Sequence, residues 1–344
     1  MIGFKFRSGD GLRADLRGLA LSLAAVVLCL LVLRELADWL LVQATFAGDM
    51  ATCRAAEGAC WPFLVAKLRF ILFAFYPTDQ LWRPIAVIVG LLSLMGVSAL
   101  PRFWGKGLLA GWGFGLAAAW GLMSGGVGLV PVSVNDWGGL PVTLLLWASC
   151  MGFAFPAAIL LALARQSRMG GLRVLSVLYI EVMRATPMVA ILYFAMLILP
   201  LGLPEGVIFD KITRAAIMTA LFFTAYLAEV VRGGLQTIPP GQAEAAAALG
   251  IGYWRMVQLV ILPQALQKVI PGLVNLAIGF LLATSLLAVI GVFDLLNAAK
   301  AATTDPLWLG FHDEAYLFVA AIYFALCFGG SRYSLWLERR LARG

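Results

Sequence analysis

The strongest constraint in this sequence is a series of apolar segments, each about as long as a bilayer is thick. A helix needs about 20 mainly apolar residues to cross a hydrocarbon core of about 30 Å. The segments are Leu19–Val42, Pro84–Leu100, Leu108–Val130, Leu140–Ala164, Arg184–Leu203, Ile212–Val231, Leu273–Leu296 and Ala315–Gly330. Runs such as Leu140–Ala164 do not alternate apolar and polar residues as barrel strands do. The sequence therefore predicts an all-α membrane protein with about eight transmembrane helices.

The composition supports this fold class. Of the 344 residues, 62% are hydrophobic and only 12% are charged, whereas a typical soluble domain has about 25% charged residues. So few charges cannot cover a water-facing surface, and so many apolar residues exclude a disordered chain. The formal net charge of +7 needs an explanation other than nucleic-acid binding.

The positions of the basic residues predict the orientation and explain this charge. Lys and Arg are enriched in the cytoplasmic loops of membrane proteins. With the N-terminus in the cytoplasm, sixteen Lys and Arg residues lie on the cytoplasmic side and six on the opposite side. We therefore expect both termini in the cytoplasm, with the excess positive charge next to anionic membrane lipids.

The longest outer segment, about residues 43–83, leaves two questions open. Cys53 and Cys60 can form a disulfide in an oxidising compartment such as the bacterial periplasm, or remain two free thiols. The stretch 61–76 is apolar but contains Lys67 and Arg69. These charges favour an amphipathic helix on the outer interface over an additional span.

The motifs of several enzyme classes are missing. The sequence contains no GxxxxGK[ST] phosphate loop, no GxSxG motif and no HExxH motif. No Cys/His spacing indicates a metal site. We therefore predict no catalytic residue, no metal ligand and no cofactor on this chain.

The most informative segment is the long cytoplasmic loop, about residues 232–272. A Pro-Pro-Gly run precedes an Ala-rich stretch, 242–249, of high helix propensity. Gly250 and Gly252 predict the end of that helix, and we expect Pro263 to break the amphipathic segment that follows. A short helix, a turn and a second helix form a compact feature that a partner protein can bind.

This loop resembles the EAA loop of ABC importer permeases. The family pattern is Glu-Ala-Ala, three residues, Gly, nine residues, an aliphatic residue, any residue and Leu-Pro. The matching residues, with the glycine that precedes them, are Gly241, Glu244, Ala245, Ala246, Gly250, Val260, Leu262 and Pro263. The flanking stretches LSVLYIEVMRATP and AYLAEVVRGGLQTIPPGQ resemble the polar amino-acid (histidine/glutamine-type) subfamily. The N-terminal stretches CRAAEGACW and YPTDQLWRP resemble the general L-amino-acid permeases of Gram-negative bacteria.

The resemblance implies a domain organisation and a set of partners. Residues 1–139 would form an N-terminal extension with three transmembrane helices and an outer loop, and residues 140–344 a type I ABC importer permease core with five. The expected partners are a cytoplasmic ABC ATPase dimer that holds ATP and Mg, a second permease subunit of sister type, and a periplasmic amino-acid-binding protein. The EAA loop is expected to form the coupling helix that docks on the ATPase. The resemblance also implies that the chain lies in the bacterial inner membrane.

Two pairs of opposite charges lie near the cytoplasmic ends of spans. Glu181 and Arg184 are three residues apart, as are Glu229 and Arg232, so each pair can share a helix face. Two interpretations stay open. Each glutamate can pair with the arginine of its own helix and fix the orientation of that helix. Alternatively, the charges can pair across helices and close the cytoplasmic end of the translocation path.

Candidates for the substrate path are polar residues within the spans. They are Tyr226, Asn275, Thr284 and Ser285, whose side chains can hydrogen-bond an amino-acid head group. Helix-packing contacts are the simpler interpretation of each.

A secondary transporter is the alternative function, but it would need ion-coordinating residues and usually an internal repeat. A scaffold or receptor would leave the EAA loop unexplained.

Overall fold

The computed structural model describes residues 11–126, 128–204 and 209–341. These residues form helices and connecting segments, with two isolated bridges and no strand among them. The chain divides into two compact units, Met1–Lys67 with Thr303–Ala315, and Leu68–Ala302 with Tyr316–Gly344. The termini predicted to be cytoplasmic, residues 1–10 and 342–344, lie outside the described residues. The expected domain boundary at 139/140 stays a prediction.

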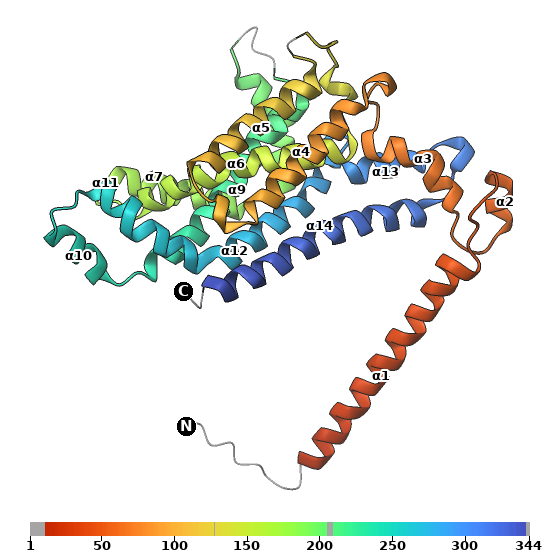
Figure 1. Ribbon diagram of the computed structural model, residues 1–344, viewed down its shortest axis with the longest axis horizontal. Helices are drawn as coiled ribbons and strands as arrows, with labels where there is room; N and C mark the ends of the chain where they lie inside the picture. Colours follow the sequence, from red (N-terminus) through yellow and green to blue (C-terminus); the bar gives the residue numbers. More distant parts are fainter. Residues whose placement is uncertain (1–10, 127, 205–208, 342–344) are drawn as a thin grey trace. The chain divides into compact units, whose positions relative to one another are not determined.

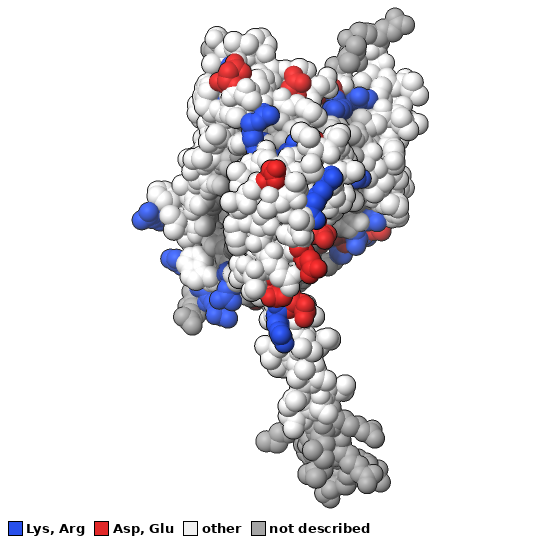
Figure 2. All heavy atoms as spheres, turned by 90° about the vertical axis from the view of Figure 1, so that its right-hand side faces the viewer, with Lys and Arg blue, Asp and Glu red and all other residues white. Residues whose placement is uncertain are grey.

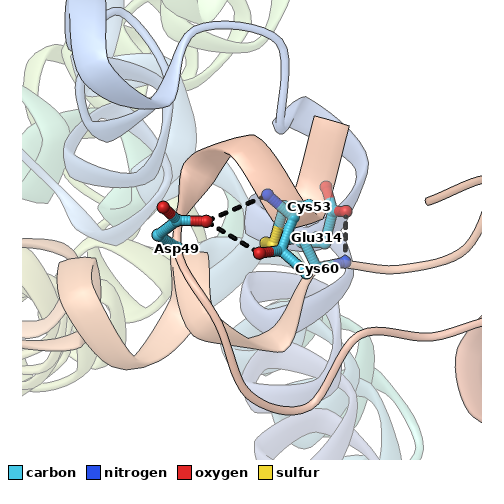
Figure 3. The surroundings of a disulfide bond; sticks show 5 residues. Asp49, Cys53, Cys60 and Glu314 are labelled. Carbon is cyan, nitrogen blue, oxygen red and sulfur yellow. Dashed lines mark hydrogen bonds between the residues drawn. A yellow bond between two sulfur atoms is a disulfide. The ribbon is translucent and has the colours of Figure 1, made fainter. Parts of the chain in front are cut away.

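The smaller unit is held together around a disulfide. Its helices are α1 (Gly11–Ala37), α2 (Met50–Ala55), the first part of α3 (Trp61–Phe73) and the start of α14 (His312–Leu341). Cys53 and Cys60 are bonded, with their Cα atoms 5.4 Å apart. Figure 3 shows the backbone N–H of Cys60 donating a hydrogen bond of 2.8 Å to the buried carboxylate of Glu314. This contact ties the disulfide loop to the first turn of α14.

Polar side chains stabilise a helix end and connect α3 to a loop in this unit. The Asp49 carboxylate accepts hydrogen bonds from the backbone N–H and the hydroxyl of Thr52, at 3.0 and 2.7 Å, and so caps α2. The backbone N–H of Thr52 is the main cause of the lowered pKa of Asp49. Lys67 of α3 pairs with Asp305, and this hydrogen bond lowers the pKa of the Asp305 carboxyl.

With 13 residues, α3 is shorter than a spanning helix needs to be, which fits the interfacial interpretation of 61–76.

The larger unit contains the remaining helices (Figure 1). They are the rest of α3, α4 (Trp82–Ser98), α5 (Lys106–Ser124), α6 (Gly139–Arg165), α7 (Gly170–Ala185), α8 (Met188–Tyr193), α9 (Lys211–Gln236), α10 (Pro240–Ala248), α11 (Tyr253–Met256), α12 (Leu262–Ala283), α13 (Leu295–Ala302) and the rest of α14. Charged side chains are sparse on the surface that Figure 2 shows, as the composition requires.

Six helical stretches of the described chain are long and apolar enough to cross a bilayer. They are Gly18–Val42, Lys106–Ser124, Gly139–Arg165, Lys211–Gln236, Tyr253–Ile290 and His312–Arg340. A seventh candidate is the pair formed by α7 and Met188–Gly202, which is bent by 104°. The apolar helix α4 has 17 residues. The predicted all-helical membrane fold is confirmed, and the number of about eight spans remains approximate.

In two of the predicted spans the structure differs from the expectation at a proline. The fifth was expected to begin at Arg184, but α7 ends at Ala185 and α8 begins after Pro187. Thr186 is extended, since a residue before proline avoids the helical region. Pro263 was expected to break a helix, but it lies in the first turn of α12, directly after the π-helical turn Val257–Ile261. The helical stretch continues through Pro263 and runs from Tyr253 to Ile290.

The core of the larger unit lies where α6, α9 and α12 meet. α6 and α9 run side by side in Figure 1. Ala154, Ala158 and Ala162 repeat every four residues on one face of α6, and all three are fully buried. Small side chains allow helices to approach closely in a membrane. At Gly234 of α9, an added Cβ would lie 2.6 Å from the backbone oxygen of Ala265 in α12, so only glycine permits this crossing.

Candidate functional site

The central part of the predicted coupling loop forms α10, an exposed helix that follows α9, whereas the two ends of the predicted loop belong to α9 and α12. Pro239 directly precedes it and Pro240 occupies its first position, where the missing N–H costs nothing. Ala246 is buried, whereas Gly241, Glu244 and Ala245 are exposed. The helix therefore has one face on its own unit and the other free for a partner.

A sharp turn ends α10 as the glycine pattern predicts. Gly250 has a φ of +70°, in the left-handed region that favours glycine. Its N–H donates to the carbonyl of Ala247 at 2.9 Å, and the N–H of Ile251 donates to the carbonyl of Ala246 at 3.0 Å. These two bonds make a Schellman motif. A Cβ at Gly250 would have open space, so backbone conformation alone selects glycine here.

Exposed apolar side chains lie next to α10. Leu249, Tyr253 and Trp254 are each more than half exposed. We call these three residues, together with Glu244 and Ala245, the coupling surface. α10 and α11 lie at the left edge of the larger unit in Figure 1. An exposed apolar group on a helix-turn-helix feature is typical of a protein-binding surface.

The loop is also connected to the helix that follows it. The Gln264 side chain of α12 donates to the Gln242 side chain of α10 at 3.3 Å and to the backbone oxygen of Val260 at 2.8 Å. Leu262 is half-buried and Pro263 exposed at the start of α12. The contact between the two glutamines connects α10 to the first turn of α12.

Near the same end of α9, acidic and basic side chains from three helices form what we call the charge cluster. Its members are Arg165 of α6, Glu181 and Arg184 of α7, and Glu229 and Arg232 of α9. Glu229 is central, with 15% of its side chain exposed. It pairs with Arg165, with Arg232 at 2.8 Å and with Arg184 at 3.6 Å. Arg165 also reaches Glu181 at 3.2 Å.

Both kinds of pairing left open by the sequence occur around Glu229. The contact with Arg232 is local, three residues along α9, whereas the contacts with Arg165 and Arg184 cross between helices. The described residues show no ion pair between Glu181 and Arg184. The cluster thus joins α6, α7 and α9 through one carboxylate.

The candidate path residues do not converge on one cavity within the described part of the chain. The Tyr226 hydroxyl donates to the backbone oxygen of Arg184 at 3.3 Å. The hydroxyls of Thr284 and Ser285 each donate to the carbonyl three residues earlier, at 2.6 and 2.7 Å, and Asn275 is exposed. The three hydroxyls donate to backbone carbonyls, and those of Thr284 and Ser285 do so within their own helical segment. Their assignment to the substrate path stays a prediction.

Comparison with known proteins decides the family. Residues 154–343 match the family described as binding-protein-dependent transport system inner membrane component, which is more than half of the chain. The chain belongs to this family. The matched region contains both the charge cluster and the coupling surface.

Individual relatives agree with this assignment. The permease is 43% identical over 317 residues to the inner membrane amino-acid ABC transporter permease protein YhdY of Escherichia coli, covering 90% of this chain and 85% of the relative. It is 36% identical over 392 residues to the glutamate/glutamine/aspartate/asparagine transport system permease protein BztC of Rhodobacter capsulatus, covering 94% and 90%. A crystal structure of an amino acid ABC transporter with histidines matches with a TM-score of 0.51 and 30% identity, over 59% of this chain and 92% of that one.

Family membership confirms several predictions. The chain is a multi-span permease subunit of the bacterial inner membrane and not an enzyme, because ATP hydrolysis in these transporters takes place on a separate chain. The family works with an ATPase and with a binding protein.

Sequence reasoning missed Arg165 as a member of the charge cluster. Arg165 is 16 residues from Glu181 and 64 residues from Glu229, so no helical spacing links it to either. The available signal was its position as the first charge after the uncharged stretch Gly139–Ala164. A cation in the last turn of a helix is also favoured by the helix dipole.

Proposed function

We propose that this permease imports amino acids through a path that it forms with a second, sister permease subunit. A cytoplasmic ATPase dimer, which holds ATP and Mg, drives the import by docking on the coupling surface, and a periplasmic amino-acid-binding protein delivers the substrate. This chain itself carries no cofactor. The amino-acid transporter names of the two relatives support the substrate class.

The observation that carries the proposal is the exposed coupling surface on a rigid turn. Alanines on α10 let the backbone of a partner approach closely, and Glu244 offers one carboxylate to a basic groove. Leu249, Tyr253 and Trp254 supply apolar area beside it. The Schellman motif at Gly250 holds these parts in a fixed geometry.

Docking on this surface can reach the helices of the path through two contacts in series. The hydrogen bond between Gln242 and Gln264 links α10 to α12. The close contact between Gly234 and Ala265 links α12 to α9. A push on α10 is therefore expected to move α9 and α12 as one body.

We assign the end of α9 that carries the coupling surface and the charge cluster to the cytoplasm, with both termini on that side. The excess of Lys and Arg on this side supports the orientation. In the conformation described here, Glu229 joins α6, α7 and α9, and we assign the cluster to closure of the inner end of the path.

The coupling role is tested with a pair of glycine variants. Gly250→Ala forces alanine into the left-handed region, at about 1–2 kcal/mol, whereas Gly252 has a φ of −66° and open space around its Cβ. In proteoliposomes of the complete transporter, Gly250→Ala should lower amino-acid uptake per ATP hydrolysed, and Gly252→Ala should behave like wild type.

Two results would refute the proposal. One is a chain purified in mild detergent without any ATPase from cells that express the whole transporter. The other is uptake that continues after ATP depletion and stops when the proton gradient is removed, which would favour a secondary transporter. Charge-swap variants of Glu229 and Arg165 whose combination fails to restore transport would refute the role of the charge cluster in closing the inner end of the path.

A further inference from the structure

A cationic pocket lies on the larger unit next to the charge cluster. Its volume is about 420 Å³. The lining comes from the C-terminal ends of α6 and α9 and from the first half of α7. The lining residues are Arg165, Gln166, Arg173, Val177, Arg232 and Gln236. Five of the six carry side chains that donate hydrogen bonds.

The pocket has more positive charge than its surroundings neutralise. Arg165 and Arg232 both pair with Glu229. Arg173 is exposed, and within the described chain its side chain has no ion pair or hydrogen bond. Together with Arg184 of the charge cluster, the three lining arginines make four positive charges against the two carboxylates Glu181 and Glu229, so two positive charges are in excess. Guanidinium groups beside amide donors are well suited to a phosphate group.

The helix that forms one wall of the pocket is amphipathic. Arg173 and Val177 line the pocket, and Glu181 continues the same face four residues later. A second face carries an exposed apolar stripe, which we define as Leu172, Leu175, Leu178 and Val182. The stripe recurs every three or four residues, as on one face of a helix.

The direction of α7 suits a position at the membrane surface. The segment Met188–Gly202 is apolar, and α7 is bent by 104° from it. If that segment crosses the bilayer, α7 runs nearly parallel to the membrane plane. Amphipathic helices at an interface place their apolar face against the acyl chains and their basic residues near the headgroups.

We propose that this pocket binds the phosphate of an anionic phospholipid of the inner leaflet, while the apolar stripe, on another face of α7, holds the helix at the level of the headgroups. The assignment to the inner leaflet rests on the proposed orientation of the permease. The lipid phosphate contacts Arg173 and also reaches Arg165 and Arg232. It competes there with Glu229, so a bound anionic lipid weakens the charge cluster and favours opening of the inner end of the path.

The proposal is tested by lipid binding to the purified full-length chain, without ATPase or transport. Native mass spectrometry would count lipids retained on titration with phosphatidylglycerol or phosphatidylcholine. One basic side chain near an anionic membrane contributes about 1 kcal/mol, so Arg173→Gln should retain phosphatidylglycerol about fivefold more weakly than wild type. Arg255→Gln removes an exposed charge of α11 outside the pocket and should leave retention unchanged.

Several outcomes would overturn the proposal. Equal retention of phosphatidylglycerol by wild type and Arg173→Gln would show that the pocket does not hold the headgroup. Retention of phosphatidylcholine as strong as that of phosphatidylglycerol would show that the site recognises only the apolar part of a lipid. Displacement of the lipid by excess inorganic phosphate would identify a free-anion site, and loss of lipid on addition of a co-purified second permease would assign the stripe to that subunit. Arg173 is exposed, so its replacement should leave thermal unfolding unchanged, and this is measured alongside.

Discussion

Replacing Glu229 by glutamine should destabilise the permease more than replacing any other member of the charge cluster. Glu229→Gln keeps the shape of the side chain and removes the one negative charge that α6, α7 and α9 share. Glu181→Gln removes the other carboxylate of the cluster, which is 57% exposed and has a single contact. The two substitutions are chemically identical, so their difference reports the environment of each carboxylate.

The expected magnitudes follow from burial and from the number of contacts. Breaking a fully buried ion pair costs about 3–5 kcal/mol, and an exposed pair contributes about 0–1 kcal/mol. Glu229 is 15% exposed and has three cationic partners, but these arginines keep access to water. We therefore expect Glu229→Gln to lower the free energy of unfolding by about 2–3 kcal/mol and Glu181→Gln by less than about 1 kcal/mol.

Two double-mutant cycles that share Arg165→Gln isolate the pairwise energies. The full-length chain is unfolded in mixed micelles with increasing sodium dodecyl sulfate, and its helix content is followed by circular dichroism. The cycle with Glu229→Gln should give a coupling energy of about 2 kcal/mol, and the cycle with Glu181→Gln about 0.5 kcal/mol. Equal coupling energies in the two cycles would refute the assignment of Glu229 as the centre of the cluster.

Three further predictions test other parts of the structure. Gly234→Ala should lower the free energy of unfolding by about 1–3 kcal/mol because its Cβ meets α12, while the neighbouring Gly233→Ala, with open space, should not destabilise; equal effects in the same unfolding assay would contradict this packing. Asp305→Asn should lower the thermal unfolding temperature at pH 7, because the hydrogen bond from Lys67 holds the folded-state pKa of Asp305 below its ordinary value of 3.8. The stabilisation is complete above that value and is lost as the pH falls through the folded pKa, so the difference between the variant and wild type should shrink progressively below pH 3.8; a difference that stays constant on acidification would argue against the ion pair. Replacing both Cys53 and Cys60 by serine should cost about 2 kcal/mol through the entropy of the unfolded chain, measured by thermal unfolding, and alkylation of both wild-type thiols without prior reduction would show that the bond is absent.

The sequence alone determined the membrane class and the coupling loop. Apolar content over 20 residues and a glycine at the end of an Ala-rich helix are local properties, and the structure has a helix and a left-handed Gly250 where they predict them. Pro187 was also a local signal, and the helix break that it imposes between α7 and α8 follows from its covalent structure. The expected fifth span began at Arg184 and would have had Pro187 in its first turn, whereas in the structure α8 begins only after Pro187.

Only the tertiary structure decided how the charges pair. Glu181 and Glu229 each have an arginine three residues later, yet within the described chain only Glu229 pairs with its own. The difference arises because α6 packs against both α7 and α9 and brings Arg165 between the two carboxylates. Helical periodicity specifies which residues share a face of one helix, whereas a contact across 64 residues depends on how the small side chains of α6 and α9 let the helices approach.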